Sequence, residues 1–163
     1  MPGKNANDIS LATGSLSKKE IDAILNALPL DITFVGPKDE VRYFNRLGKR
    51  IFPRTKEVIG RKVRDCHPPK SIAKVEEILS GFRSGKRDSA EFWIGLKGRS
   101  PLKEGVAKTE GERQKEGVSR RLQSLVHIRY FAVRNPKGRY LGCLEVSQDI
   151  TEIKGLEGEK RLL

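Results

Sequence analysis

Apolar residues recur with a helical period in two stretches of the chain. The first stripe lies within residues 21–28, directly after Ser17 and Glu20, which are spaced as a capping box. The second lies within residues 72–82, after a pair of prolines. The spacing predicts an amphipathic helix in each stretch, with one apolar face turned toward a core.

Other segments are rich in β-branched and aromatic residues and are bounded by turn residues, which predicts strands. These segments are residues 32–35, 41–44, 89–96, 122–133 and 140–146. They fall into two hairpin groups with helical segments between them, which is not a parallel βαβ pattern. We expect an α+β fold, with a five-stranded antiparallel sheet, helices on one face, and flanking helices at the N- and C-terminal sides.

The length of 163 residues fits one compact domain. We expect a flexible arm over residues 1–16, the domain over residues 17–151, and a C-terminal helix over residues 152–163. Residues 97–121 hold eight Lys and Arg, four Glu and several glycines, so we interpret them as a charged, mobile insertion in that domain.

The formal net charge is +12, and residues 42–74 carry eleven Lys and Arg against two acidic residues. Such a surface suits either an anionic partner or a heat-stable protein, and composition does not choose between them. The sequence has no helix-turn-helix, zinc-finger or RNA-binding signature, so we do not expect a nucleic-acid partner. A basic protein associated with nucleic acid is nevertheless an alternative function.

The sequence has no apolar run of membrane-spanning length and no hydrophobic signal stretch near its start. We therefore expect a cytoplasmic protein that makes no membrane contact. The two cysteines are too few for a disulfide scaffold.

Local motifs add to this element order. Asn45 ends the second predicted strand, Cys66, His67 and Pro68 precede the main helix, and residues 148–152 read Gln-Asp-Ile-Thr-Glu after the last strand. In order and position these motifs resemble those of a PAS domain, a small sensor fold. The resemblance implies that the domain over residues 17–151 is a sensor and that residues 152–163 are its output helix.

The sequence is similar, in greater detail, to the PAS-like C-terminal module of an uncharacterised prokaryotic family that often also carries a hemerythrin-like domain. The similar segments are residues 28–35, 42–44, 60–63, 66–71, 91–94, 127–134 and 156–163. None of the 163 residues resembles the hemerythrin-like domain, and residues 97–121 resemble an insertion where the relatives have a short turn.

Aromatic and polarisable side chains could line a cavity for a small ligand, because such cavities combine an aromatic lining with a few polar groups. Alternation places Phe92 and Trp93 on opposite faces of their strand, so one of them faces inward. The candidate pocket residues are Phe34, Phe44, Cys66, His67, Trp93 and Tyr130.

His67 or Cys66 could also serve as the axial ligand of a heme, as the PAS resemblance implies for this region. The structural alternative is that His67 braces the start of the main helix. A zinc site would need His127 and Cys143 to converge on the same pair without a paired motif, which the sequence disfavours.

We expect a sensory or interaction module that binds a small ligand or a partner, and we expect no enzyme because no catalytic motif is present. Asp149, Thr151 and Glu152 are the candidate signal-transmission residues. They would pass the signal through the C-terminal helix to a second copy of the chain or to a separate signalling partner. The alternative is a sensor that uses heme or another redox cofactor.

Overall fold

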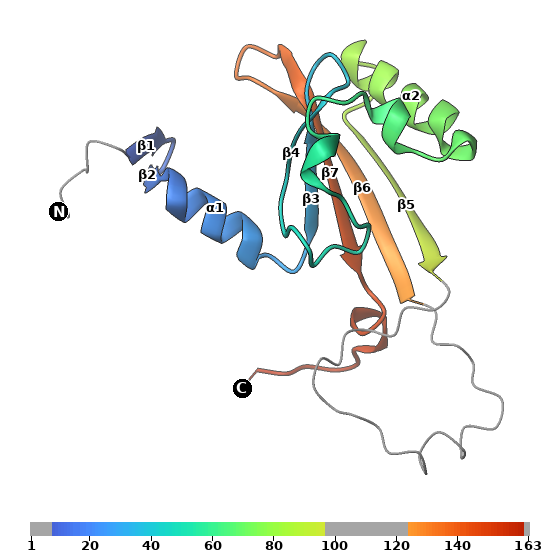
Figure 1. Cartoon of the computed structure of the whole chain (residues 1–163). Helices are drawn as coiled ribbons and strands as arrows, with labels where there is room; N and C mark the ends of the chain where they lie inside the picture. The colour runs from blue at the N-terminus through green and yellow to red at the C-terminus, as the bar shows by residue number, and fades with distance from the viewer. Residues whose placement is uncertain (1–7, 97–123, 162–163) are drawn as a thin grey trace.

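The computed structural model describes residues 8–96 and 124–161. Figure 1 shows the course of the chain. The strands are β1 (Asp8–Leu11), β2 (Gly14–Ser17), β3 (Asp31–Val35), β4 (Val41–Phe44), β5 (Ser89–Leu96), β6 (Ser124–Arg134) and β7 (Tyr140–Asp149). The helices are α1 (Lys18–Ala27) and α2 (Pro69–Arg83), with short 3-10 helices η1 (Lys56–Val58), η2 (Val63–Cys66) and η3 (Ile153–Gly155).

Five of the described strands form one antiparallel sheet in the order β4-β3-β7-β6-β5. This confirms the predicted α+β class and the predicted sheet. Burial alternates along β5 and along the first part of β6, because successive side chains of a strand point to opposite faces. The predicted insertion, residues 97–121, lies outside the described residues, as do the first two residues of the strand predicted over 122–133.

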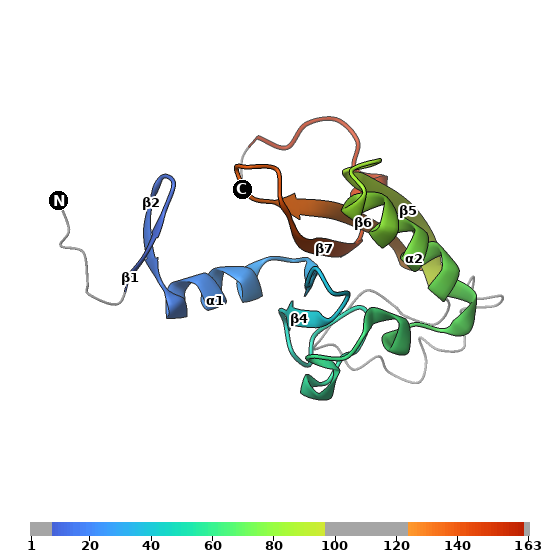
Figure 2. The same cartoon turned by 90° about the horizontal axis from the view of Figure 1, so that it is seen from above.

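The helix α2 covers one face of the sheet, which we call the inner face (Figures 1 and 2). Its proline at the first helical position has no amide hydrogen to leave unpaired. Val75, Ile78, Leu79 and Phe82 form the buried stripe that the period predicted. Burying each of these side chains stabilises the fold by about 1.5–3 kcal/mol. No helix in the described part of the chain is long and apolar enough to cross a membrane.

The N-terminal region differs in part from the prediction. The capping box is confirmed: the Ser17 hydroxyl accepts from the Glu20 amide at 3.2 Å, and the Glu20 carboxylate accepts from the Ser17 amide at 2.7 Å. Residues 8–17, however, form the hairpin β1–β2, where a loose arm was predicted over residues 1–16. Together with α1, this hairpin extends away from the sheet on the side of β3 and β4 (Figures 1 and 2).

The prediction of an output helix over residues 152–163 is wrong for the described residues of this region. Strand β7 continues to Asp149, and the only helical turn after it in the described residues, up to 161, is η3. The physical reason is that the polar residues after β7 bond to β6 rather than starting a helix. Thr151 accepts from the Leu125 amide at 2.8 Å, and the Ile150 amide donates to the Leu125 carbonyl at 2.8 Å. Leu156 then adopts an extended conformation, with φ −72° and ψ 128°, which ends the helical turn after Gly155.

Candidate functional site

The inner face of the sheet carries polar residues in the middle of an otherwise apolar core. Register places Asp31 of β3 opposite Ser147 of β7, and Glu145 of β7 opposite both Thr33 of β3 and Tyr130 of β6. Directly opposed residues share a face, so the five side chains form one patch. All five residues are buried. Because burying charge is costly, this patch needs specific partners.

Arg50 supplies the first partner. It comes from the segment after β4, and its side chain is 1% exposed. Its Nη2 donates to the Thr33 hydroxyl at 3.0 Å, and its Nη1 donates to the Ile32 carbonyl at 3.1 Å. Burial lowers the pKa of Arg50, and the nearby Asp31 carboxylate opposes that change. The group stays a cation because guanidinium ionises so far above neutral pH.

Arg54 supplies the second partner. Its side chain is 10% exposed, and its Nη2 lies 3.6 Å from Glu145 Oε1, which makes a buried ion pair. Burial raises the pKa of Tyr130, and the neighbouring Glu145 raises it further. We name Asp31, Arg50, Arg54 and Glu145 the inner charge cluster. Such a cluster can orient a polar ligand because charged hydrogen-bonding groups are held rigidly inside a dry core.

Asn45 connects the inner charge cluster to α1. The residue is 1% exposed. Its Oδ1 accepts from the Ile32 amide at 2.7 Å and from Arg50 Nη1 at 3.1 Å. Its Nδ2 donates to the Leu25 carbonyl near the end of α1 at 2.7 Å, and to the Leu30 carbonyl at 2.9 Å. One side chain therefore touches the strand, the cluster and the helix.

The sequence did not point to this cluster as a site. Its members come from positions 31, 50, 54 and 145, and no short-range spacing indicates that they meet. The available signal was a charge inside an apolar run: Asp31 sits between Leu30 and Ile32, and Glu145 between Leu144 and Val146. A charged residue that is buried in a strand is almost always paired with an opposite charge from another part of the chain.

The predicted aromatic pocket residues do not all come together. Tyr130 lies on the inner face, where Phe92 stacks on it with ring centroids 5.9 Å apart. Phe44 also lies there, with the Arg50 guanidinium 5.4 Å from its ring centroid. Phe34 pairs with Leu144 on the opposite, outer face. The prediction that Trp93 lines the pocket is wrong. Its side chain is 66% exposed, and Phe92 takes the inward position on β5.

Cys66 and His67 lie at the end of η2. Cys66 is partly buried against the core, and His67 Nδ1 donates to the Val63 carbonyl at 2.9 Å. That hydrogen bond braces the connection into α2, as the structural alternative for His67 predicted. Heme ligation by either residue stays a prediction. Cys143 lies on the inner face, where burial raises the pKa of its thiol to about 12, so it is a poor nucleophile.

A four-ligand zinc site is not formed. Among the described residues, no group of three or more His, Cys, Asp and Glu could hold a metal ion. His127 lies opposite Trp93 on the outer face, and its Nε2 donates to the Glu91 carboxylate at 2.8 Å, whereas Cys143 is on the inner face. The sheet therefore separates the residues that zinc would require together.

The candidate transmission residues join β6 to the segment after β7. Asp149 Oδ1 accepts from the Thr151 amide at 3.0 Å and from the Thr151 hydroxyl at 2.5 Å. Burial acts to raise the pKa of Asp149, but the hydrogen bonds from Thr151 and Ser124 outweigh it and lower the pKa below its ordinary value. Glu152 is exposed and directly precedes η3.

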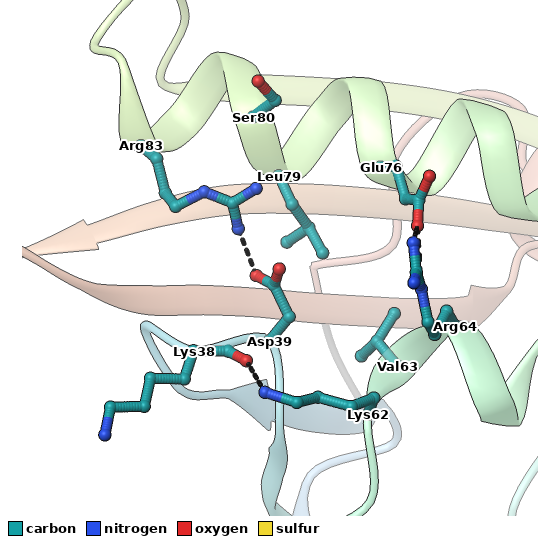
Figure 3. A pocket seen from close by; sticks show the side chains of 9 residues that line it. All are labelled: Lys38, Asp39, Lys62, Val63, Arg64, Glu76, Leu79, Ser80 and Arg83. Carbon is teal, nitrogen blue, oxygen red and sulfur yellow. Dashed lines mark hydrogen bonds and ion pairs between the residues drawn. The ribbon is translucent and has the colours of Figure 1, made fainter.

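A separate cleft of about 420 Å³ lies between α2, η2 and the β3–β4 turn (Figure 3). Arg83 pairs with Asp39, Arg64 pairs with Glu76, and Lys62 Nζ donates to the Lys38 carbonyl at 2.6 Å. The cleft contains none of the predicted pocket residues. Three of its cations bind groups of the protein itself: Arg83 joins α2 to the β3–β4 turn, Arg64 joins η2 to α2, and Lys62 joins the segment before η2 to that turn.

The comparisons with known proteins agree with this fold. A family model described as a PAS domain matches residues 21–120. The chain is similar to the C-terminal domain of a Streptococcus mutans protein, with 33% identity and a TM-score of 0.70 over 92% of this chain and 97% of that one. No match was found among curated proteins.

More distant structures share the fold alone. The PAS domain of a Colwellia psychrerythraea protein is 15% identical, with a TM-score of 0.52 over 82% of this chain and 97% of that one. A PAS domain from Bordetella pertussis is 11% identical, with a TM-score of 0.50 over 81% of this chain and 85% of that one. The association with a hemerythrin-like domain stays a prediction. The family match spans more than half of the sequence, and with the Streptococcus mutans relative it establishes that this chain belongs to the PAS domain family.

Proposed function

We propose that this chain is a sensory and interaction module that holds a small ligand at the inner charge cluster and passes the change to α1. Membership of the PAS family supports this role, because PAS domains are generally sensory or interaction modules rather than enzymes. Two free cysteines, Cys66 and Cys143, suit a reducing compartment, so a cytoplasmic location is part of the proposal.

The observation that carries the proposal is the pair of hydrogen bonds made by Asn45. The amide oxygen of Asn45 accepts from Arg50 within the cluster, and its amide nitrogen donates to the last turn of α1. A ligand that repositions Arg50 changes the geometry available to Asn45 and thereby the attachment of α1. Such a ligand shifts the helix only as far as its affinity differs between the two arrangements.

The direction of transmission that we propose differs from the one that the sequence predicted. Asp149 and Thr151 are engaged in closing the β6–β7 end of the sheet. We assign them to holding that end of the sheet and assign the readout to α1, because α1 is the helix that is hydrogen-bonded to the cluster.

A second copy of the chain is the proposed partner. The helix α1 has no buried residue, and Ile24 in its apolar stripe is 48% exposed. On the outer face of the sheet, Trp93 and Phe131 are 66% and 37% exposed. Pairing of two copies through these surfaces would remove apolar area from water, at about 25 cal/mol for each Å² buried.

Sedimentation analysis tests this partner. We expect the wild-type chain to be a dimer and Ile24→Glu to be a monomer. Leu47→Glu is the matched control, since Leu47 is 54% exposed in the connection after β4 and should leave the dimer intact. A wild-type chain that stays monomeric at high micromolar concentration contradicts the homodimer.

Hydrogen exchange tests the coupling without requiring a ligand. Glu145→Gln removes the charge partner of Arg54 in the cluster, and we expect faster exchange of the α1 amides in this variant. Glu77→Gln is the control, because Glu77 lies on the exposed side of α2 and pairs with Arg87 at 3.3 Å. The proposal fails if Glu145→Gln changes exchange in β3 and β7 while α1 is unaffected.

A further inference from the structure

Three buried polar atoms of the inner face lack the hydrogen bonds that buried polar atoms normally make. Within the described residues, no hydrogen bond reaches Arg54 Nε, Asp31 Oδ1 or Ser147 Oγ. Asp31 and Ser147 are each 1% exposed, and the Arg54 side chain is 10% exposed. Buried polar atoms are rarely left without a hydrogen bond because each such atom destabilises the fold, so three together indicate a missing polar partner.

The orphaned atom of Arg54 lies on the edge that binds carboxylates. The Nε and Nη2 hydrogens of a guanidinium point the same way and can donate to both oxygens of one carboxylate. In this chain Nη2 lies 3.6 Å from Glu145 Oε1, which exceeds a hydrogen-bond distance, and Nε has no acceptor. Glu145 thus offsets the charge of Arg54 without satisfying its donors.

The other two orphaned atoms are suited to a different group. Asp31 and Ser147 are directly opposed on β3 and β7, so their side chains lie within about 5 Å of each other. Asp31 Oδ1 has Arg46 Nη1 at 3.6 Å as an ion-pair partner but accepts no hydrogen bond, so it can take a donor. The hydroxyl of Ser147 can accept or donate. An amino or hydroxyl group placed between them would satisfy both.

The charge balance limits the ligand further. Arg46, 3.6 Å from Asp31, joins Arg50 and Arg54 as a third cation, against the carboxylates of Asp31 and Glu145. Three positive and two negative groups leave one positive charge. A single carboxylate balances that charge, whereas the two carboxylates already present would repel a dianion such as a phosphate monoester.

We propose that the inner charge cluster binds a small carboxylic acid that carries an amino or hydroxyl group next to its carboxylate. Arg54 takes the carboxylate through Nε and Nη2, and Asp31 with Ser147 takes the neighbouring donor. This inference rests on the proposed function, since it names the class of ligand for the same site.

Isothermal titration calorimetry of the full chain tests this assignment. The probes are L-lactate, glycine and L-alanine, and each is compared with a relative that lacks one group: propionate without the donor and L-alaninamide without the carboxylate. Inorganic phosphate is the dianion control. We expect at least one complete acid to bind, and we expect at least tenfold weaker binding of its incomplete relative and of phosphate.

Variants tie the binding to the named atoms. Arg54→Gln should weaken binding of the acid at least tenfold, while Arg64→Gln, which removes the same charge from an exposed ion pair with Glu76, should not. Ser147→Ala removes an unpaired hydroxyl, so we expect it to fold normally and still bind several-fold more weakly. This second variant keeps the test decisive if Arg54→Gln does not fold.

Two outcomes overturn the assignment. One is the absence of binding by all three complete acids at millimolar concentration, and the other is binding that neither Arg54→Gln nor Ser147→Ala changes. Either outcome leaves the coupling between the cluster and α1 to be judged by hydrogen exchange in Glu145→Gln. Failure of the ligand class is therefore distinguishable from failure of the sensory role.

Discussion

The segments that flank the sheet are attached to it in contrasting ways. At the N-terminal side, α1 is held by Asn45, a fully buried amide that also bonds to the inner charge cluster. At the C-terminal side, the segment after β7 is held by Asp149 and Thr151, which are only partly buried and bond to β6. A segment that lies close to the sheet is therefore not necessarily coupled to the inner charge cluster. Of these two attachments, only that of α1 runs through a residue, Asn45, that is also hydrogen-bonded to the cluster.

The largest effect should come from the N-terminal attachment. Asn45→Ala removes four hydrogen bonds made with Leu25, Leu30, Ile32 and Arg50. Because the partner groups on Ile32 and Arg50 stay buried and those on Leu25 and Leu30 stay partly buried, we expect a loss of about 3 kcal/mol in the free energy of unfolding, measured with urea.

The matched control is Asn26→Ala, which removes two exposed hydrogen bonds, one from the Arg46 amide and one to the Asp22 carbonyl. We expect it to cost about 1 kcal/mol or less. Equal losses in the two variants would show that Asn45 acts locally and does not link α1 to the cluster.

The C-terminal attachment should yield a smaller effect. Thr151→Val keeps the shape of the side chain but removes the acceptor of the Leu125 amide. We expect a loss of about 1–2 kcal/mol and faster hydrogen exchange at Leu125. Exchange in α1 should stay as in the wild type, and a change there would contradict the separation of the two flanks.

A third change acts on α1 alone. Ser17→Ala removes the capping hydroxyl that accepts from the Glu20 amide, which should cost about 1 kcal/mol of local helix stability. Circular dichroism should report a small loss of helix, while unfolding of the sheet keeps its midpoint. Ser10→Ala, in the exposed strand β1, serves as the control. A shifted midpoint for Ser17→Ala would show that α1 supports the sheet itself.

The smallest effect concerns pH at the C-terminal flank. The pKa of Asp149 in the folded chain lies below its ordinary value of 3.8. The stability it contributes is therefore fully present above that ordinary value and is lost as the pH falls through the folded pKa. In thermal unfolding at pH 3 to 5, the wild type should lose more stability on acidification than Asp149→Asn. Parallel curves for the two proteins would contradict this contribution.

The sequence predicted the parts of the fold that depend on local pattern. The stripe of α2, the capping box at Ser17 and the antiparallel strands follow from spacing alone. The predicted helix after Asp149 failed because Thr151 finds a tertiary partner in β6, which no local pattern reveals.

The site was predicted less completely, for a related reason. Alternation showed that Phe92 and Trp93 face opposite sides of β5, but it could not tell which side meets α2. Aromatic residues in strands indicate a core, and Tyr130 and Phe44 do lie on the inner face, although their part in ligand binding stays a prediction. Arg50, Arg54 and Glu145 were missed because their meeting depends on the packing of residues 45–68 across the sheet.

The exposed position of Trp93 has a practical consequence. It is the single tryptophan of the sequence, and it lies on the face of the sheet opposite the inner charge cluster. Its fluorescence emission should shift to shorter wavelength when another protein covers that face and should be insensitive to small molecules bound at the inner charge cluster on the other face. The chain thus contains its own optical reporter of association, with no label to attach.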